Sequence, residues 1–304
     1  MGISLRTLNF LGLDEKGLSP ETADVLIQPI PYDSTTSFQP GSRFGPEAIL
    51  QASQQVELWD EELGWEPMAH TTSLTLPEIP RNLQGPEMML RDIYQSLWPY
   101  WEQKKFILAL GGEHTIALPL IQGIKQTHSD LVVLVMDAHA DLRESWEGSS
   151  FSHACTLKRI AEQDVPIFHL GLRSLSKEEQ VYLDGQTQIR SYSSQEILFQ
   201  NGLNRFQSDL AAMAGRNFYL SLDIDVLDPS LVPGTGTPEP GGVGWYDLLQ
   251  AIKIITRYGP IRGGDLCELL PIPGSRLSEF VAAKLIFKLL SYIFYHAKEE
   301  NHHV

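Results

Sequence analysis

Short apolar runs alternate with amphipathic stretches along most of the chain. Several runs, such as FILAL and LVVLVM, are almost continuously apolar, which is typical of strands buried on both faces of a parallel sheet. The strands predicted in this way span residues 23–30, 106–110, 131–137, 167–170, 218–223 and 261–268. Patterns of helical period between them predict helices over residues 46–59, 87–102, 114–126, 152–162, 245–256 and 277–295.

This alternation predicts an α/β fold, a three-layer α/β/α sandwich with a mostly parallel central sheet. We find no internal repeat. The Pro- and Gly-rich stretch 229–244 is either a boundary or a functional loop between a strand and a helix. We expect a single domain over residues 1–304, with a short N-terminal arm at about 1–22 and a polar tail at about 297–304. In such sheets, sites lie beyond the carboxyl ends of the strands.

Acidic residues and histidines end two of the predicted strands. The segment VVLVMDAHADL runs from an apolar strand into Asp137, His139 and Asp141, which are separated by alanines. The segment YLSLDIDVLDP repeats the spacing with Asp223 and Asp225. Residues at i, i+2 and i+4 of an extended chain point the same way. We therefore expect each set to project from one face of its strand.

A third strand leads through a Gly-Gly-Glu turn into His114. Four carboxylates at the mouths of buried strands would repel one another and would be costly to desolvate. Two divalent cations remove both problems, and one carboxylate can bridge them. Oxygen ligands with some imidazole favour Mn²⁺, although Fe²⁺, Co²⁺, Ni²⁺ and Zn²⁺ are also compatible. Each residue alone could be a cap or turn residue, but the repeated pattern favours a dinuclear metal site.

Composition narrows the range of partners. The chain has 304 residues, with 38 acidic and 23 basic ones, and a formal net charge of −15. This balance argues against nucleic acid or an anionic membrane as a partner and is compatible with a cationic small molecule, although a solvated acidic surface explains it equally well. Two cysteines, Cys155 and Cys267, are too few for a disulfide framework and favour a reduced, cytoplasmic protein. We expect neither a secretory signal nor a membrane span.

Five segments together resemble the signature segments of the ureohydrolase (arginase/agmatinase) family. They are PIPYDSTTSFQPGSRFGPEAI, GGEHTIALP, MDAHADLRESWEGSSFSHA, SLDIDVLDPSLVPGTGTPEPGG and GGDLCELLPIPG. They occur in the family's order and cover roughly residues 24–294. The resemblance implies an arginase-like fold and two Mn²⁺ per subunit. Many relatives have GGDH where this chain has GGEH, but the residue before the histidine is not a ligand in the family.

The resemblance also implies which residues hold each ion. The ligands of one ion would be His114, Asp137, Asp141 and Asp223. The ligands of the other would be His139, Asp137, Asp223 and Asp225. Asp137 and Asp223 would then be the bridging carboxylates.

The chemistry that the resemblance implies is hydrolysis of a guanidinium group. A hydroxide that bridges the two ions would attack the guanidinium carbon, and Asp141 would pass its proton to the leaving amine. Glu268 matches the family's guanidinium-binding glutamate, although a strand-end surface glutamate is the alternative. His153 matches the family's proton-shuttling histidine. The alternative is a residue at a helix start beside a Ser152 cap, and both interpretations could hold at once.

Two loops are expected to wall the pocket, residues 229–244 and the early segment SFQPGSRFGP. In the second, we expect Arg43 to make structural rather than chemical contacts. The remaining histidines match no motif and are interpreted as structural or surface groups: His70, His128, His169, His296, His302 and His303.

The substrate is expected to be agmatine, cleaved to putrescine and urea. Arginases typically carry an Asn where this chain has Arg143, and a Gly where it has Ala154, so the chain resembles the agmatinase-like branch. An acidic rim with Glu144 or Glu147 would suit the distal ammonium of agmatine. Arg143 could equally favour a carboxylate-ended substrate such as 4-guanidinobutyrate. Guanidinopropionase, guanidinase, formimidoylglutamase and arginase activities remain alternatives.

Two hypotheses from other classes are weighed. One is a catalytically dead homologue that acts as a regulatory subunit, and the complete set of expected site residues weighs against it. The other is a mononuclear zinc deacetylase on a related fold, which would not need His139 together with Asp225. Family resemblance further suggests a homo-oligomer, a trimer or a hexamer, with helix 277–295 either in the core or at an interface.

Overall fold

The computed structural model describes residues 8–302, with side chains up to residue 296. One eight-stranded sheet forms its centre, in the order β2-β1-β3-β8-β7-β4-β5-β6. All pairings between neighbouring strands are parallel. The strands are β1 (Val25–Ile30), β2 (Ser73–Thr75), β3 (Phe106–Gly111), β4 (Val132–Met136), β5 (Ile167–Leu172), β6 (Ile189–Ser193), β7 (Phe218–Asp223) and β8 (Ile261–Cys267).

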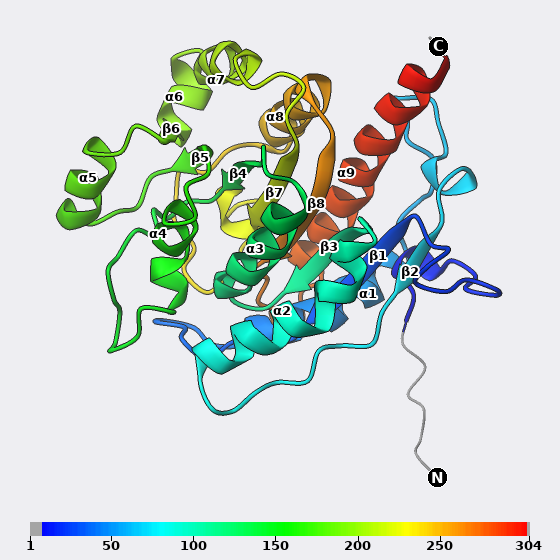
Figure 1. Cartoon of the computed structure of the whole chain (residues 1–304), viewed down its shortest axis with the longest axis horizontal. Helices are drawn as coiled ribbons and strands as arrows, with labels where there is room; N and C mark the ends of the chain where they lie inside the picture. The colour runs from blue at the N-terminus through cyan, green and yellow to red at the C-terminus, as the bar shows by residue number, and fades with distance from the viewer. Residues whose placement is uncertain (1–7, 303–304) are drawn as a thin grey trace.

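Helices cover both faces of this sheet (Figure 1). They are α1 (Gly45–Ser53), α2 (Pro86–Glu102), α3 (Ala117–Thr127), α4 (Thr156–Ala161), α5 (Lys177–Asp184), α6 (Ser194–Phe199), α7 (Gly202–Ala211), α8 (Trp245–Tyr258) and α9 (Leu277–His302). Strand side chains alternate between two cores: Ile107 belongs to the core that includes side chains of α2, α3 and α4, whereas Leu108 belongs to the core that includes side chains of α1, α7, α8 and α9. The predicted three-layer α/β/α sandwich is confirmed, and its sheet is parallel throughout.

The structure adds elements that the apolar pattern did not predict. They are β2, β6 and the helices α5, α6 and α7. β2 is only three residues long, and β6 has the largely polar sequence IRSYS at the edge of the sheet. α5 lies on the surface with Val181 exposed, so it shows little apolar periodicity. Short, edge and surface elements bury little apolar area and leave a weak pattern.

Several predicted boundaries were wrong. The strand predicted over 131–137 ends at Met136, and the helix predicted over 46–59 ends at Ser53. The helices predicted from residues 114 and 152 begin as single 3-10 turns, His114–Ile116 and His153–Cys155, before α3 and α4 continue them. α9 continues beyond the predicted end at residue 295, to His302.

The predicted arm and tail are only partly within the described residues. Phe10 and Leu11 are buried in the core with α1, and Asn9 hydrogen-bonds to the backbone of Ser73 and Thr75 in β2. This part of the arm is therefore packed against the sheet. Residues 1–7 and 303–304 lie outside the described residues, and 297–302 belong to the backbone of α9.

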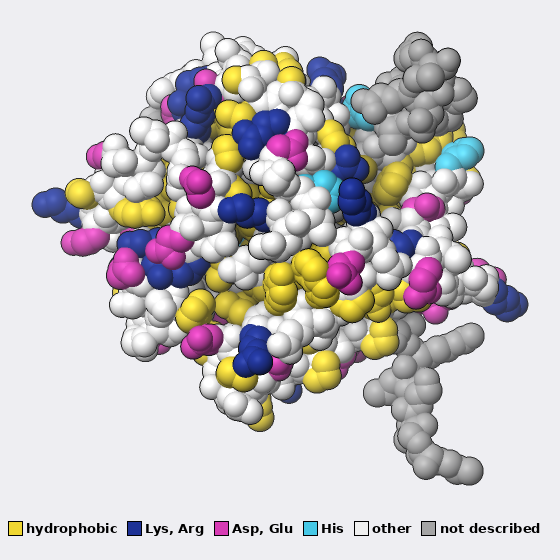
Figure 2. Space-filling model, viewed as in Figure 1, with side chains coloured by type: hydrophobic (Ala, Val, Ile, Leu, Met, Phe, Trp, Pro, Cys, Tyr) yellow, Lys and Arg dark blue, Asp and Glu magenta, His cyan; other side chains and the backbone are white. Residues whose placement is uncertain are grey.

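Strand order explains where the polar strand ends meet. β3, β8, β7 and β4 are consecutive neighbours in the middle of the sheet, because the last two strands of the chain insert between β3 and β4. The carboxyl ends of parallel strands share one edge, so the residues that follow these four strands converge. On the face of the molecule in Figure 2, acidic side chains are scattered among basic ones. Within residues 8–302, no helix is long and apolar enough to cross a membrane.

Candidate metal centre

The six candidate ligands lie at the carboxyl ends of three central strands. His114 follows β3 after the Gly-Gly-Glu turn, and Asp137, His139 and Asp141 follow β4. Asp223 is the last residue of β7, and Asp225 lies in the 3-10 turn after it.

The backbone after these strands is not extended, contrary to the prediction from the i, i+2, i+4 spacing. Asp141 has a φ of 51°, in the left-handed region. Asp225 lies inside the 3-10 turn Ile224–Val226 rather than on the continuing strand. The chain therefore turns over the sheet edge, and these turns bring the side chains together.

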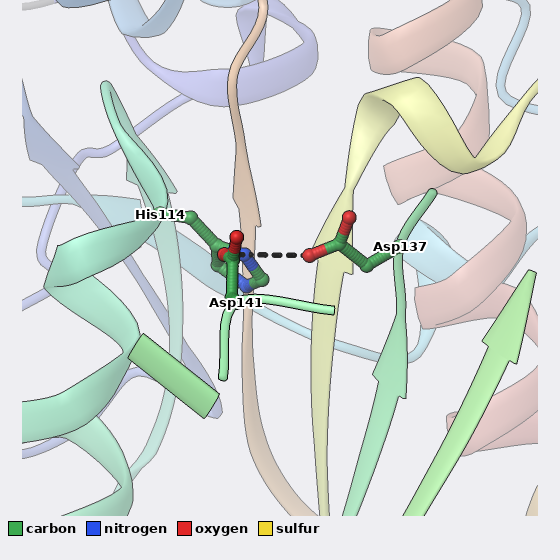
Figure 3. A group of neighbouring side chains, drawn as sticks. All are labelled: His114, Asp137 and Asp141. Carbon is green, nitrogen blue, oxygen red and sulfur yellow. Dashed lines mark ion pairs between the residues drawn. The ribbon is translucent and has the colours of Figure 1, made fainter. Parts of the chain in front are cut away.

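The first group surrounds the imidazole of His114 (Figure 3). Its Nδ1 atom lies 3.0 Å from Oδ2 of Asp137, 3.4 Å from Oδ2 of Asp141 and 3.7 Å from Oδ2 of Asp223. Figure 3 shows Asp137 and Asp141 turned toward this ring from the chain after β4. The Nδ1 atom is buried and, among the described residues, has no hydrogen-bond partner of normal geometry. A buried nitrogen among three carboxylate oxygens is the arrangement expected of a metal ligand.

The second group surrounds His139. Its Nδ1 atom lies 2.8 Å from Oδ2 of Asp225 and 3.7 Å from Oδ1 of Asp137. Asp137 thus faces His114 with one oxygen and His139 with the other. Each group offers ligand atoms that lie within 4.8 Å of one another, and Asp137 is common to both. This donor set fits two cations joined by a shared carboxylate.

The cluster contains several buried carboxylates, and their negative charge has to be balanced by positive charge. Asp137 and Asp141 outweigh the effect of burial and hold the pKa of His114 well above its usual value. Likewise, Asp225 outweighs burial and raises the pKa of His139 to about 10. Burial and the nearby Asp137 raise the pKa of Asp141 to about 7. Buried carboxylates in this number must be balanced by protons or by metal cations, which supports the fit of a dinuclear centre.

Backbone amides fix the orientation of the carboxylates. The backbone N–H of His139 donates to Oδ1 of Asp137 at 2.6 Å, and that of Ala138 donates to Oδ1 of Asp225 at 3.0 Å. The backbone N–H of Asp225 donates to Oδ1 of Asp223 at 2.9 Å. The carboxylates are therefore held in place by the turns that carry them.

A buried hydrogen-bond chain behind His114 was not predicted. The Nε2 atom of His114 lies 2.9 Å from the hydroxyl of Ser221, which donates to Asp265 at 2.9 Å. Tyr219 donates its hydroxyl to the other oxygen of Asp265 at 2.7 Å. Second partners of this kind orient metal-binding imidazoles. The available signal was Asp265 itself, an acidic residue within the apolar strand IRGGDLC.

A second missed residue lies behind Asp137. His169 in β5 is fully buried, and its Nε2 atom lies 3.2 Å from the backbone oxygen of Asp137. The sequence predicted a structural or surface role for His169, but it did not predict that His169 lies beside the candidate ligands. Nothing local in the sequence FHLGL distinguishes it, because the contact depends on the pairing of β5 with β4.

A cavity of about 270 Å³ lies over the cluster. Its lining includes His114, His139, Asp141, Asp223, Asp225, His153 and Glu268. Glu268 follows β8, has a φ of 63°, and accepts a hydrogen bond from the backbone N–H of His114 at 2.7 Å. Burial and the neighbouring Glu113 hold the pKa of Glu268 well above its usual range. A carboxylate here can pair with a cationic group above the cluster.

His153 lies in the wall of the same cavity. Its Nδ1 atom is 3.2 Å from the hydroxyl of Thr35, and its Nε2 atom is 3.3 Å from the hydroxyl of Ser37. Burial lowers the pKa of His153 to about 4, so the ring is neutral near pH 7. Ser152 occupies the cap position but makes no side-chain cap hydrogen bond, so the predicted capping role is wrong.

The mouth of the cavity differs from the expected acidic rim. Glu144 is an exposed side chain that pairs with Lys158 and Arg159, and neither it nor Glu147 lines the cavity. The prediction that these two carboxylates face the substrate was therefore wrong. They lie on the turn after the motif, and the turn directs them away from the cavity.

Glu179 and Arg143 line the mouth instead. The guanidinium of Arg143 stacks over the ring of Trp146, 4.4 Å from its centroid, and lies 3.9 Å from Oε2 of Glu179. Glu179 is buried and also accepts backbone hydrogen bonds from Leu142 and Ser176. Arg143 is thus engaged by an aromatic face and a carboxylate within the protein.

Both expected loops contribute to the wall. Gly236 and Thr237 of the 229–244 loop line the cavity, as do Ser37 and Phe38 of the early loop. Arg43 pairs with the buried carboxylate of Asp33, which agrees with the structural role expected of it.

Comparisons with known proteins show the family and the fold of this chain. A model of the arginase family matches residues 23–291. An N(1)-aminopropylagmatine ureohydrolase of Synechocystis sp. is 35% identical over 275 residues, which are 89% of each chain. An agmatinase of Pyrococcus horikoshii is 33% identical, over 88% of this chain and 91% of its own. The crystal structure of a putative agmatinase from Clostridium difficile superposes with a TM-score of 0.82 at 30% identity, covering 90% of this chain and 98% of its own.

Proposed function

Because the chain belongs to the arginase family and is an amidinohydrolase, we propose that it hydrolyses agmatine to putrescine and urea at a pair of Mn²⁺ ions. The observation that carries the proposal is the double role of Asp137, whose two oxygens face His114 and His139 on the floor of one cavity. A mononuclear zinc site would not need the second group.

The residues that would hold the ions are those of the two groups. One ion would be held by His114, Asp137 and Asp141 with the neighbouring Asp223, and the other by His139, Asp137 and Asp225, with Asp223 as the second shared carboxylate that the family resemblance implies. When bound, the ions supply a water molecule of lowered pKa and neutralise the buried carboxylates. Mn²⁺ suits this mixture of carboxylates and imidazoles, and other divalent transition metals are compatible.

The protein's own residues position the substrate and move its protons. Glu268 pairs with the guanidinium and orients it over the cluster. Water adds to the guanidinium carbon, the bond to the alkyl nitrogen breaks, and the products are urea and an amine. Asp141 transfers a proton to the leaving nitrogen, and the neutral ring of His153 exchanges a further proton with the products in the cavity.

The mouth of the cavity supports a substrate without an α-carboxylate. Arg143 is the arginine that lines the cavity among the described residues, and Glu179 and Trp146 already engage it. An α-carboxylate would have to compete with Glu179 for this cation. A substrate without an α-carboxylate, such as agmatine, does not need this cation.

The second candidate substrate is N1-aminopropylagmatine, which would give urea and spermidine. The 35% identity to the Synechocystis enzyme favours it, since that relative carries this activity in its name. The longer substrate differs from agmatine only at the distal end, where it has an additional amine. Both candidates therefore require the same groups around the guanidinium.

The test is urea release by the Mn²⁺-loaded protein from a panel of guanidino compounds. The panel contains agmatine, N1-aminopropylagmatine, arginine, 4-guanidinobutyrate, 3-guanidinopropionate, formimidoylglutamate (scored as formamide release) and free guanidine. We expect the highest kcat/KM with agmatine. A higher value with N1-aminopropylagmatine would establish the second candidate, and a preference for arginine would refute both. No turnover of any compound would favour a regulatory homologue.

We further propose a cytoplasmic homo-oligomer, a trimer or a hexamer, as family resemblance suggests. Light scattering after size-exclusion chromatography measures the mass directly. A species at the monomer mass of 34.1 kDa would refute the assembly.

A further inference from the structure

The Nδ1 edge of the His153 ring contacts the hydroxyl of Thr35, a residue from a loop that is distant in the sequence. The hydroxyl oxygen of Thr35 lies 3.2 Å from Nδ1 of His153 and also accepts the backbone N–H of His153 at 2.9 Å. The hydroxyl of Ser152 lies 3.3 Å from the same Nδ1. Both oxygens are therefore candidate partners of this nitrogen.

Thr35 is in turn held by Glu113, the residue before the ligand His114. Thr35 donates its hydroxyl to Oε1 of Glu113 at 3.0 Å and its backbone N–H to Oε2 at 2.7 Å. Ser34 and Thr115 donate two further hydrogen bonds to this fully buried carboxylate, at 2.6 and 2.7 Å. All four neighbours can donate, and two of them, the backbone amides, can only donate. The carboxylate of Glu113 is thus placed as the acceptor of all four hydrogen bonds, including that from the hydroxyl of Thr35.

The single hydroxyl proton of Thr35 then determines the direction of the hydrogen bonds between Glu113, Thr35 and His153. Thr35 has one hydroxyl proton, and it points to Glu113. Its oxygen can therefore only accept from His153. If Nδ1 carried no proton, two lone pairs would face each other at 3.2 Å. If Nδ1 carries the proton, Thr35 and Ser152 can both accept from it.

We propose that Glu113 and Thr35 are positioning residues that fix the neutral His153 in the tautomer with its proton on Nδ1. The inference rests on the proposed function only for the role of His153 in the reaction. This tautomer leaves Nε2 as an unprotonated base on the side of Ser37 and the cavity. The ring is then ready to accept a proton from the substrate side at Nε2.

The tautomer can be measured directly. Long-range ¹H–¹⁵N spectra of the full-length ¹⁵N-labelled protein, loaded with diamagnetic Zn²⁺ at pH 7.5, distinguish protonated from unprotonated ring nitrogens, and a His153→Gln variant assigns the signals. We expect a protonated Nδ1 and an unprotonated Nε2. A protonated Nε2 in the unmodified protein would overturn the inference.

Matched variants test which residue sets the tautomer. Thr35→Val removes the acceptor, so we expect His153 to shift toward the Nε2-protonated form, with Ser152 donating to Nδ1. Thr35→Ser keeps the hydroxyl and should keep the original tautomer, as should Ser152→Ala. An unchanged tautomer in Thr35→Val would refute the role of Thr35.

Kinetics of the Mn²⁺-loaded variants link the tautomer to the reaction. We expect kcat to fall at least about 10-fold in Thr35→Val while the metal content is unchanged, and to recover to within about 3-fold in Thr35→Ser. Glu113→Asp, whose carboxylate is one methylene shorter, should lie between them and serves if Thr35→Val fails to fold. If the protein gives the expected spectrum but releases no urea, the proposed function is refuted, whereas the inference about the tautomer still holds.

Discussion

The Oδ2 atom of Asp137 lies 3.0 Å from the buried Nδ1 atom of His114. The other oxygen of Asp137 faces His139, so one carboxylate connects both groups of the cluster. Asp225 belongs to the candidate ligands around His139 and is not among those around His114. Removal of Asp137 and removal of Asp225 should therefore have different effects on metal binding.

We expect Asp137→Ala to lose both metal ions and Asp225→Ala to retain one. Asp137 contributes to each group, whereas Asp225 contributes to the group of His139 alone. The measurement is metal content per chain by mass spectrometry after exhaustive dialysis. Urea release should fall at least about 100-fold in both variants, since the chemistry needs both ions. Glu144→Ala, an exposed carboxylate outside the cavity, is the control. Full metal content in Asp225→Ala would contradict the assignment.

We expect Ser221→Ala to weaken metal binding without removing a ligand. Ser221 connects Nε2 of His114 to Asp265, and loss of such an orienting partner typically costs about 10- to 100-fold in metal affinity. Competition with a chelator measures the affinity, and excess Mn²⁺ should restore most of the activity. Ser291→Ala is the matched control, because the hydroxyl of this buried serine donates to the backbone oxygen of Phe287 in its own helix α9, away from the cluster. Equal metal affinities in the two variants would refute a role in metal binding for the hydrogen bonds that connect His114 through Ser221 to Asp265.

We expect Arg143→Met to increase the preference for dicationic substrates. The change removes the cation beside Glu179 and makes the cavity mouth more negative by one unit. One charge at several ångströms in a hydrated site is worth about 1 kcal/mol, so the ratio of kcat/KM for agmatine to that for 4-guanidinobutyrate should rise about 3- to 10-fold. Arg276→Met changes the net charge equally at an exposed side chain on the surface and should leave the ratio unchanged. A falling ratio would show that Arg143 does not oppose the distal cation.

We expect Lys288→Met to destabilise the fold by about 3–5 kcal/mol. Lys288 is buried in α9 and lies 2.9 Å from the buried carboxylate of Asp60, which would be left unpaired. Adding Asp60→Asn should recover part of the loss in urea-induced unfolding. Additive effects of the two changes would contradict a coupled pair.

The pH dependence of this pair follows from the sign of its shift. Burial opposes the charge on Lys288, but Asp60 and Glu61 outweigh it and raise its pKa above the usual value. A raised folded pKa contributes stability that is fully present below the unfolded pKa of about 10.4 and is lost as the pH rises through the folded one. The destabilisation by Lys288→Met should therefore be constant from pH 6 to 9.

The central strands of the sheet and the cluster of candidate ligands could be predicted from the sequence because their signals are local. Runs such as LVVLVM are buried on both faces and leave a nearly unbroken apolar pattern. The polar residues that end these runs stand out against them, as Asp137 and Asp223 do. The edge strand β6 and the surface helix α5 bury little apolar area, and the sequence showed no corresponding pattern.

Contacts between distant segments were decided only by the tertiary structure. Asp265 backs His114 because β8 inserts between β3 and β7, and Glu113 reaches His153 only through Thr35. Glu179, and not Glu144, lines the cavity because α5 brings its carboxylate to the chain after Asp141, where it accepts the backbone N–H of Leu142. The sequence by itself determined the six apolar strands and placed carboxylates and imidazoles at their ends, since these patterns depend on neighbouring residues. Strand order and turn geometry determined which second partners support the ligands, because hydrogen bonds depend on position in space rather than along the chain.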